Sequence, residues 1–243
     1  MTKKPRFLIL ETGRPVPSMR RHGAFPHLIR SAAGLTPRQV QGVPVLDGHA
    51  PPDPRGYAGA IVTGSGAMVT DREPWSEATA DWLRRAIEHG LPMLGICYGH
   101  QLLAHALGGR VDWNPRGREM GTVAIELQDS ARHDPLFENV PTRFHAQTTH
   151  LQSVTAPPPG AAVLARSALD DCHAFRWGRS AWGLQFHPEF STAHMRGYIT
   201  ARREALHREG RCPVRMLESV RPAPVARSLL RRFVRHALAQ RHG

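Results

Sequence analysis

The sequence contains no long hydrophobic run. None of its apolar stretches approaches the roughly 20 residues that a membrane-spanning helix needs, so we do not expect a membrane protein. The first residues also lack the apolar region and the small-residue cleavage site of a signal peptide, which favours a cytoplasmic protein. With 243 residues, of which 41% are hydrophobic, the chain can form a sizeable core and is not expected to be disordered as a whole.

Cysteine is also scarce. The three cysteines, Cys97, Cys172 and Cys212, are odd in number and far apart, which fits neither a disulfide framework nor a zinc knuckle. Among the histidines, His100 and His105 miss the (i, i+4) spacing that places two metal ligands on one face of a helix. We therefore expect no metal and no cofactor.

Lysine is nearly absent. Only Lys3 and Lys4 occur, which excludes the lysine-containing phosphate loop of ordinary nucleoside triphosphatases. The net charge of +12 rests on arginine, and residues 196–243, with 12 Arg and 3 Glu, contribute +9 of it. Because residues 1–195 are close to neutral, the charge distribution does not favour nucleic-acid binding.

The order of apolar patterns predicts an α/β fold. Short apolar runs bounded by turn residues alternate with longer helical patterns, which is typical of βαβ units around a mostly parallel sheet. Helices are expected to begin at Ser76, to follow Cys97, and to cover residues 192–208. The expected strands are 6–10, 59–63, 92–96, 121–127, 161–166, 172–177 and 181–186. The later strands are closely spaced, which indicates hairpins beside an open sheet flanked by helices.

The end of the chain differs from the rest. We expect one domain over residues 1–210, followed by a Pro/Arg-rich linker and a basic amphipathic helix within residues 211–243. Such a helix packs on its own domain or on a second copy of the chain, or it binds an anionic partner or a membrane surface. The sequence leaves these alternatives open, and it suggests that the tail is dispensable for chemistry in residues 1–210.

A candidate nucleophile lies in the segment Gly95-Ile-Cys97-Tyr-Gly99. An apolar strand ends at Cys97 and a helix follows at once, which predicts a nucleophile elbow with sulfur in place of the serine oxygen. The flanking glycines leave room for the crowded turn, and the helix N-terminus stabilises an attacking thiolate. A buried cysteine at a tight turn is the alternative interpretation of this segment taken alone.

Two further segments supply partners for a nucleophile. His187 ends an apolar strand, and Pro188 extends the chain so that Glu189 lies on the same side as the histidine and can orient it. Residues 64–66 form a glycine turn after another strand, and their backbone N–H groups, with that of Tyr98, are candidates for an oxyanion hole.

In this order and spacing, the segments around Cys97, residues 64–66 and His187 resemble the class I glutamine amidotransferases. The resemblance is greatest to the glutaminase domain of GMP synthetases and its free-standing bacterial relatives, and it covers about residues 6–200. It implies a flavodoxin-like α/β sandwich. It also implies a Cys97-His187-Glu189 triad that hydrolyses the side-chain amide of glutamine through a γ-glutamyl thioester.

The resemblance also implies substrate-binding residues. Gly64, Ser65, Gly66 and Tyr98 would bind the oxyanion, and Gln101 would lie beside the bound glutamine. Many relatives contact the α-amino and α-carboxylate groups through a His-Gly-Asp turn, and at that place this chain departs from the pattern. Four residues are expected to form the corresponding loop, with an ordinary loop histidine as the alternative for the last: Gln147, Thr148, Thr149 and His150.

Three functions fit these residues. The first is hydrolysis of glutamine with delivery of ammonia to a separate synthetase, because no acceptor-activating segment is expected after the glutaminase body. The second is a γ-glutamyl peptidase or hydrolase that acts on γ-glutamyl amides or glutathione-like compounds. The third is an inactive binding protein, which the matched triad argues against. A homo-oligomer is possible in each case.

Overall fold

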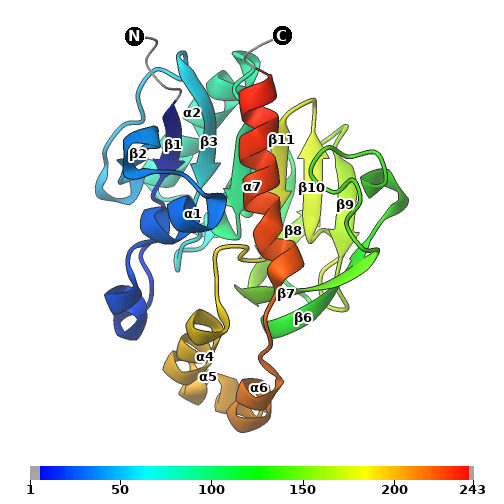
Figure 1. Ribbon diagram of the computed structural model, residues 1–243. Coiled ribbons are helices and arrows are strands. Elements are labelled where there is room, and N and C mark those ends of the chain that lie inside the picture. Colours follow the sequence, from blue (N-terminus) through cyan, green and yellow to red (C-terminus); the bar gives the residue numbers. More distant parts are fainter. Residues whose placement is uncertain (1–5, 241–243) are drawn as a thin grey trace.

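The computed structural model describes residues 6–240 as a nine-stranded sheet with helices on both faces (Figure 1). Five neighbouring strands run parallel: β2 (Val40–Val43), β1 (Arg6–Leu10), β3 (Tyr57–Val62), β4 (Met93–Ile96) and β11 (Ala181–Leu184). Four antiparallel strands extend the sheet: β10 (Ala174–Trp177), β9 (Ala162–Arg166), β6 (Glu119–Leu127) and β7 (Arg143–His150). A separate ribbon pairs β5 (Arg110–Trp113) with β8 (Gln152–Ala156). The expected α/β fold is confirmed.

Helices cover the two faces of the sheet. One face carries α1 (Phe25–Ala33) and α7 (Pro224–Ala239), and the other carries α2 (Pro74–Glu88) and α3 (Tyr98–Ala106). Below the sheet in Figure 1 lie α4 (Thr192–Ala201), α5 (Arg203–Arg208) and α6 (Pro213–Ser219). Among residues 6–240, no helix is both long and apolar enough to cross a bilayer.

The inner parallel strands β1, β3, β4 and β11 are nearly continuous apolar runs, as expected for strands with both faces buried, whereas the edge strand β2 is partly polar and exposed. In β1, Phe7 and Ile9 belong to the core beneath α1 and α7, whereas Leu8 and Leu10 belong to the core beneath α2 and α3. Successive side chains of a strand point to opposite faces, so one run of five residues contributes to both cores.

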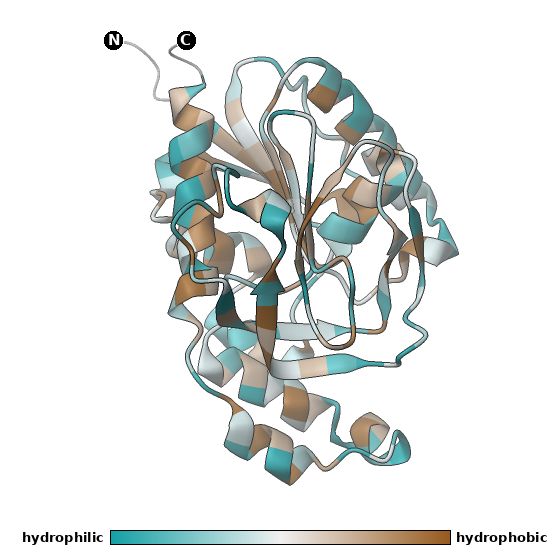
Figure 2. Ribbon diagram, turned by 90° about the vertical axis from the view of Figure 1, so that its right-hand side faces the viewer, coloured by the Kyte–Doolittle hydropathy of each residue, from teal (hydrophilic) through white to brown (hydrophobic). Residues whose placement is uncertain are grey.

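The C-terminal helix α7 packs on its own domain, which was one of the alternatives left open by the sequence. Its apolar side faces the sheet, and the hydrophilic residues face outward (Figure 2). Phe233 is fully buried and makes edge contacts with Phe7 and Trp182, with ring centres 6.5 and 6.3 Å apart. The domain boundary expected at residue 210 stays a prediction. Residues on both sides of it pack into one hydrophobic core.

Several local expectations were wrong. Ser76 does not cap α2, which begins at Pro74; its hydroxyl instead contacts the Tyr98 hydroxyl at 2.6 Å. The helix expected over 192–208 is broken at Arg202. The expected linker contains α6, whose Met216 and Leu217 pack against the core. The sequence analysis also did not predict β2, α1, β5, β7 or β8, because their patterns are short or polar.

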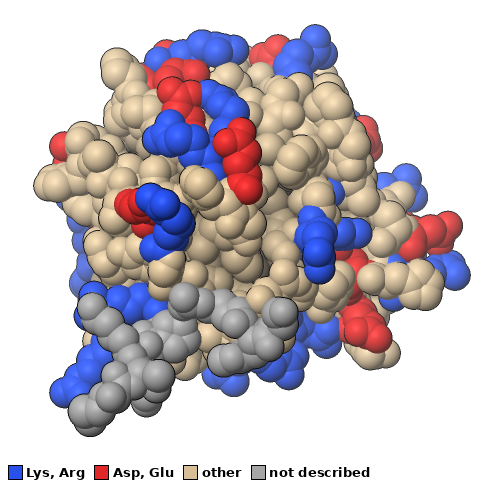
Figure 3. Space-filling view, turned by 90° about the horizontal axis from the view of Figure 1, so that it is seen from above, with Lys and Arg blue, Asp and Glu red and all other residues tan. Residues whose placement is uncertain are grey.

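On one face of the molecule, charges of both signs lie close together (Figure 3). On the face seen in Figure 3, arginine side chains lie next to Asp and Glu side chains, with neutral residues between them. Arginine–carboxylate pairs such as Arg84–Asp81 and Arg55–Asp53 occur on the surface.

The packing of α7 predicts a large stability effect for one of its residues. Phe233→Ala should lower the free energy of unfolding by about 3–5 kcal/mol, because it leaves a cavity between Phe7 and Trp182. Arg235→Ala on the exposed side of the same helix should change it by less than about 0.5 kcal/mol. Urea unfolding followed by circular dichroism measures both values. Equal values for the two variants would show that α7 is not part of the core.

Candidate active site

Cys97 lies at the turn between β4 and α3, as predicted. Its φ of 52° and ψ of −104° place a residue other than glycine at positive φ, which is an uncommon and strained conformation. The Cys97 N–H donates to the Leu184 carbonyl at 2.8 Å. A Cβ atom added to Gly95 would lie 2.3 Å from the Gly99 carbonyl oxygen, so the turn requires glycine there. This is the geometry of a nucleophile elbow.

His187 and Glu189 follow β11 and are oriented toward each other. His187 Nδ1 lies 2.8 Å from Glu189 Oε1, and the His187 N–H donates to the Gln147 carbonyl at 2.8 Å. The Phe190 ring stacks on the imidazole, with ring centres 4.1 Å apart and 16° between the planes. With Nδ1 held by the carboxylate, Nε2 is the nitrogen that remains for a thiol.

The surroundings of His187 favour its charged form. Burial by itself lowers the pKa of the imidazole, but Glu189 and Cys97 outweigh burial and raise the pKa of His187 to about 10. The group is therefore an imidazolium at neutral pH, which suits a thiolate partner.

The glycine turn after β3 brings these groups together. A Cβ added to Gly64 would lie 2.9 Å from His187 Cε1 and 3.6 Å from Cys97 Cβ, so Gly64 contacts both side chains. On another side, Cys97 Sγ lies 3.8 Å from the Thr149 carbonyl oxygen. Three segments that are far apart in the sequence thus meet at the thiol.

A cleft opens beside Cys97, and seven of the twelve predicted site residues line it: Ser65, Gly66, Cys97, Tyr98, Gln101, Thr149 and His150. Gly64, His187 and Glu189 do not line this cleft. Gln101 Nε2 donates to the Gln152 carbonyl at 2.7 Å and to Gln185 Oε1 at 2.9 Å, which fixes its side chain in the wall.

The expected loop at 147–150 was wrong. These residues end strand β7, which pairs along its whole length with β6, so Thr148 and Thr149 have the extended backbone that β-branched residues favour. Gln147 faces away from the cleft and binds Thr122 and the Arg221 carbonyl. The Thr148 hydroxyl is buried without a partner among the described residues. Of the four predicted residues, Thr149 and His150 line the cleft, and Gln147 and Thr148 do not.

His150 is not an ordinary loop histidine. It is buried, and its Nε2 lies 3.1 Å from Glu119 Oε2, while its Nδ1 lies 2.9 Å from the Gln152 carbonyl oxygen. His173 Nε2 lies 2.7 Å from the same Glu119 oxygen. No local sequence pattern indicates this group, because its members come from different strands and turns.

Two arginines in the cleft were also not predicted. Arg118 is nearly buried and pairs with Glu209, with Nε 2.9 Å from Oε2. Arg202 lies where α4 ends, and its buried Nε has no hydrogen-bond partner among residues 6–240. Burial and the charge of Arg118 lower the pKa of Arg202. The cleft therefore has positive charge that suits a carboxylate.

The other two cysteines lie outside this site. Cys172 is buried and does not line the cleft, and burial together with Asp170 raises the pKa of its thiol. Cys212 is exposed at the start of α6.

Comparisons with known proteins agree with this geometry. The sequence model of the class-I glutamine amidotransferase family matches residues 50–203, and the chain belongs to this family. The chain is 33% identical to one of the subunits of the glutamine-hydrolyzing GMP synthase of Methanopyrus kandleri over 172 residues, which are 69% of this chain and 85% of that relative.

Longer relatives match only in part. The glutamine-hydrolyzing GMP synthase of Thermomicrobium roseum is 45% identical over 131 residues, which are 54% of this chain but 23% of that protein. The chain thus spans about a quarter of the length of the GMP synthases of this kind that it matches. A glutamine amidotransferase structure from Thermotoga maritima has the same fold, with a TM-score of 0.75 at 22% identity over 96% of this chain and 98% of that one.

The contact between Gly64 and His187 predicts a matched pair of variants. Gly64→Ala should slow alkylation of Cys97 by iodoacetamide at neutral pH about tenfold, because the added methyl displaces the imidazolium that stabilises the thiolate. Gly66→Ala, whose Cβ meets nothing within 4 Å, should stay within about twofold of the original chain. Peptide mass spectrometry gives both rates. Similar rates for the two variants would contradict the arrangement.

Proposed function

We propose that this chain hydrolyses the side-chain amide of glutamine through a γ-glutamyl thioester on Cys97 and delivers the ammonia to a separate enzyme. The observation that carries the proposal is the strained elbow that holds Cys97 beside the His187–Glu189 pair. Membership of the class-I glutamine amidotransferase family supports the same chemistry.

The reaction begins when the Cys97 thiolate attacks the amide carbon of the substrate. The oxyanion that forms accepts hydrogen bonds from backbone N–H groups of residues 64–66 and of Tyr98, which lies in the first turn of α3, where helical amides have no intrahelical acceptor. His187 then donates its proton to the leaving nitrogen, and ammonia departs as the thioester forms.

Hydrolysis of the thioester reverses these roles. Neutral His187 removes a proton from a water molecule, whose oxygen attacks the thioester carbon, and glutamate leaves as the Cys97 thiolate is restored. Glu189 orients the imidazole through Nδ1 and stabilises its positive charge in both steps.

The two arginines of the cleft are candidates to bind the end of the substrate that is far from the amide bond. We assign Arg202, supported by Arg118, to the α-carboxylate of glutamine, because Arg202 Nε has no acceptor of its own among the described residues. Gln101 and Thr149 lie in the same cleft and would contact the rest of the substrate. The stiff strand in the wall favours the small leaving group of glutamine over a peptide.

An acceptor enzyme completes the proposal. The relative from Methanopyrus kandleri is named as one subunit of a glutamine-hydrolyzing GMP synthase, and this chain covers most of it. We infer that ammonia from this chain likewise passes to a synthetase on another polypeptide. The γ-glutamyl peptidase function remains as the second candidate, and the choice of substrate tests it.

The first experiment measures ammonia release from glutamine. Cys97→Ser should lose at least about 99.9% of the activity, because a serine hydroxyl stays protonated at neutral pH, whereas Cys212→Ser should retain it. The original chain should also act on glutamine with a higher kcat/KM than on any γ-glutamyl dipeptide. A dipeptide preferred about tenfold over glutamine, which is about 1.4 kcal/mol in transition-state binding, would replace this function with that of a peptidase.

The pH dependence tests the role of His187. Activity requires the imidazolium as proton donor, so kcat/KM should fall as the pH rises through about 10. Glu189→Gln removes a group that raises the pKa of His187, so the fall should occur at lower pH. The amino group of the substrate titrates equally with both proteins, and the difference between the profiles therefore belongs to the enzyme. Profiles that coincide would contradict the assignment.

Arg202 is tested by separating binding from chemistry. Arg202→Gln should raise KM for glutamine about tenfold and leave kcat within about threefold, because the α-carboxylate is bound equally in the ground and transition states. The exposed neighbour Arg203 supplies the control, since Arg203→Gln should change neither constant. An unchanged KM in Arg202→Gln would show that another group binds the carboxylate.

A further inference from the structure

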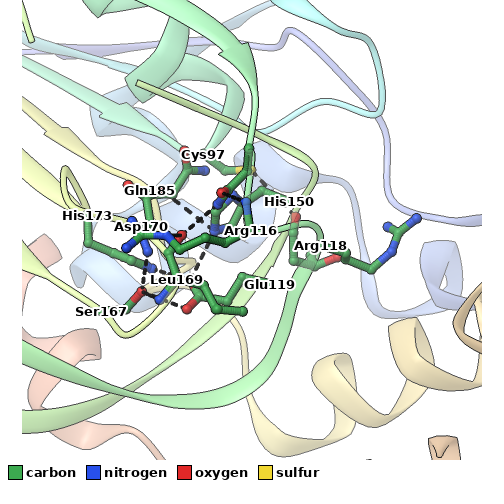
Figure 4. A network of polar contacts seen from close by, with 12 residues as sticks. Cys97, Arg116, Arg118, Glu119, His150, Ser167, Leu169, Asp170, His173 and Gln185 are labelled. Atoms are coloured by element: carbon green, nitrogen blue, oxygen red, sulfur yellow. Dashed lines mark hydrogen bonds and ion pairs between the residues drawn. The ribbon is translucent and has the colours of Figure 1, made fainter. Parts of the chain in front are cut away.

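A buried group of acidic and histidine side chains is shown close up in Figure 4. It comprises Glu119 on β6, His150 at the end of β7, and His173 just before β10. One ligand atom of each residue lies within 4.8 Å of the others, and each of the three side chains is at most 4% exposed. The two Nε2 atoms converge on the same oxygen, Glu119 Oε2, at 3.1 and 2.7 Å.

A second carboxylate points into the same group. Asp170 Oδ2 lies 3.9 Å from His150 Nε2, and the side chain is 1% exposed. Its other oxygen, Oδ1, accepts the Cys172 N–H at 2.9 Å, whereas Oδ2 has no hydrogen-bond partner among the described residues. An unpaired carboxylate oxygen in such a buried place requires a proton or a cation nearby.

The hydrogen bond on the far side of His150 determines where its proton lies. The Gln152 carbonyl 2.9 Å from Nδ1 can only accept, so Nδ1 carries the hydrogen. In a neutral ring, Nε2 then presents its lone pair to Glu119 Oε2, which is repulsive at 3.1 Å. Either a second proton or a metal ion must lie between these two atoms. A backbone carbonyl that accepts from the other ring nitrogen is the usual support of a metal-binding histidine.

The neighbouring arginines do not neutralise the two carboxylates. Arg116 donates to the Leu169 carbonyl and pairs with Asp171, and Arg118 pairs with Glu209. His100, the third histidine nearby, is fully buried, which disfavours a charge on its ring. Within the described chain, positive charge for the group must therefore come from His150 and His173 or from a bound cation.

We propose that Glu119 Oε2, His150 Nε2, His173 Nε2 and Asp170 Oδ2 form a structural zinc site. Two imidazoles and two carboxylates are donors that Zn²⁺ accepts, and tetrahedral zinc with bonds of about 2.0–2.1 Å separates neighbouring donors by about 3.3 Å. The separations of 2.7 and 3.1 Å between the imidazole nitrogens and Glu119 Oε2 are close to that value. Asp170 Oδ2 is 3.9 Å from His150 Nε2 and lies outside the group of three, so its carboxylate must move toward the ion to become the fourth ligand. The Ser167 hydroxyl, 2.6 Å from Glu119 Oε1, orients the carboxylate from behind.

The place of the site in the fold indicates its role. It joins β6, β7 and the turn before β10, and His150 also lines the cleft beside Cys97. With four protein ligands, the ion has no open position for substrate or water, so it stabilises the wall of the cleft and takes no part in the chemistry. This inference is independent of the proposed glutamine hydrolysis.

The first test is the zinc content of the full chain. Protein purified with zinc present and freed of loose metal by gel filtration should hold about one zinc per chain by plasma mass spectrometry. Chain stripped with a chelator and titrated with Zn²⁺ should bind one equivalent and unfold at a higher temperature than the stripped form. A zinc content below about 0.1 per chain, before and after incubation with Zn²⁺, would overturn the proposal. It would show that protons, and not a metal ion, lie between the histidine nitrogens and the carboxylates.

Variants locate the ion. His173→Gln and Asp170→Asn should each weaken zinc binding at least about a hundredfold, whereas His105→Gln, a histidine paired with Glu77 away from the group, should not weaken it. Co²⁺ bound to the stripped chain should show the visible absorption of a tetrahedral ion, and His173→Gln should abolish it. Where a variant does not fold, the Co²⁺ spectrum of the original chain decides, because an octahedral spectrum contradicts the site.

The thiol at Cys97 is a competing place for zinc, because it lies beside His187. Cys97→Ser should therefore retain the full equivalent of zinc and the same Co²⁺ spectrum. Loss of the ion in Cys97→Ser together with its retention in His173→Gln would place the metal at the thiol and overturn the proposal.

Discussion

The pairing of β4 with β11 is the constraint on which the site depends. These neighbouring parallel strands align Gly95 with Gly183 and Ile96 with Leu184, and the Cys97 N–H continues the pairing to the Leu184 carbonyl at 2.8 Å. Parallel strands end at the same edge of a sheet, so the thiol and the histidine that follows β11 emerge side by side. A shift of this register would separate them even if every catalytic side chain were present.

The C-terminal helix supports the same place from the other face. Besides burying Phe233 against the sheet, α7 sends Arg227 to the loop after β11, where its guanidinium donates to the Glu189 carbonyl at 3.2 Å. The residue that orients His187 is thereby held by a part of the chain that the sequence suggested was dispensable. Three arginines of α7 thus donate hydrogen bonds to backbone carbonyls of the same domain: Arg227 to Glu189, Arg231 to Ala32 and Arg232 to Glu138.

The sequence predicts those parts of the site that depend on local patterns. The elbow at Cys97 follows from a strand, two glycines and a helix in direct succession, and Glu189 orients His187 from two residues away. Other features depend on contacts between distant segments. The polar residues of β7 form a strand only because β6 supplies their hydrogen bonds, and Arg202 reaches the cleft only because the helix from 192 breaks beside it. Glu119, His150 and His173 likewise meet through the sheet, so their separation along the chain conceals them.

The most direct measurement is mass spectrometry of the protein mixed with glutamine and quenched in acid during turnover. If Cys97 is the nucleophile, peptides that contain it should carry a γ-glutamyl group, and hydroxylamine should remove this group because it is a thioester. Ammonia release without a γ-glutamyl group on Cys97, or the group on a different residue, would contradict the mechanism.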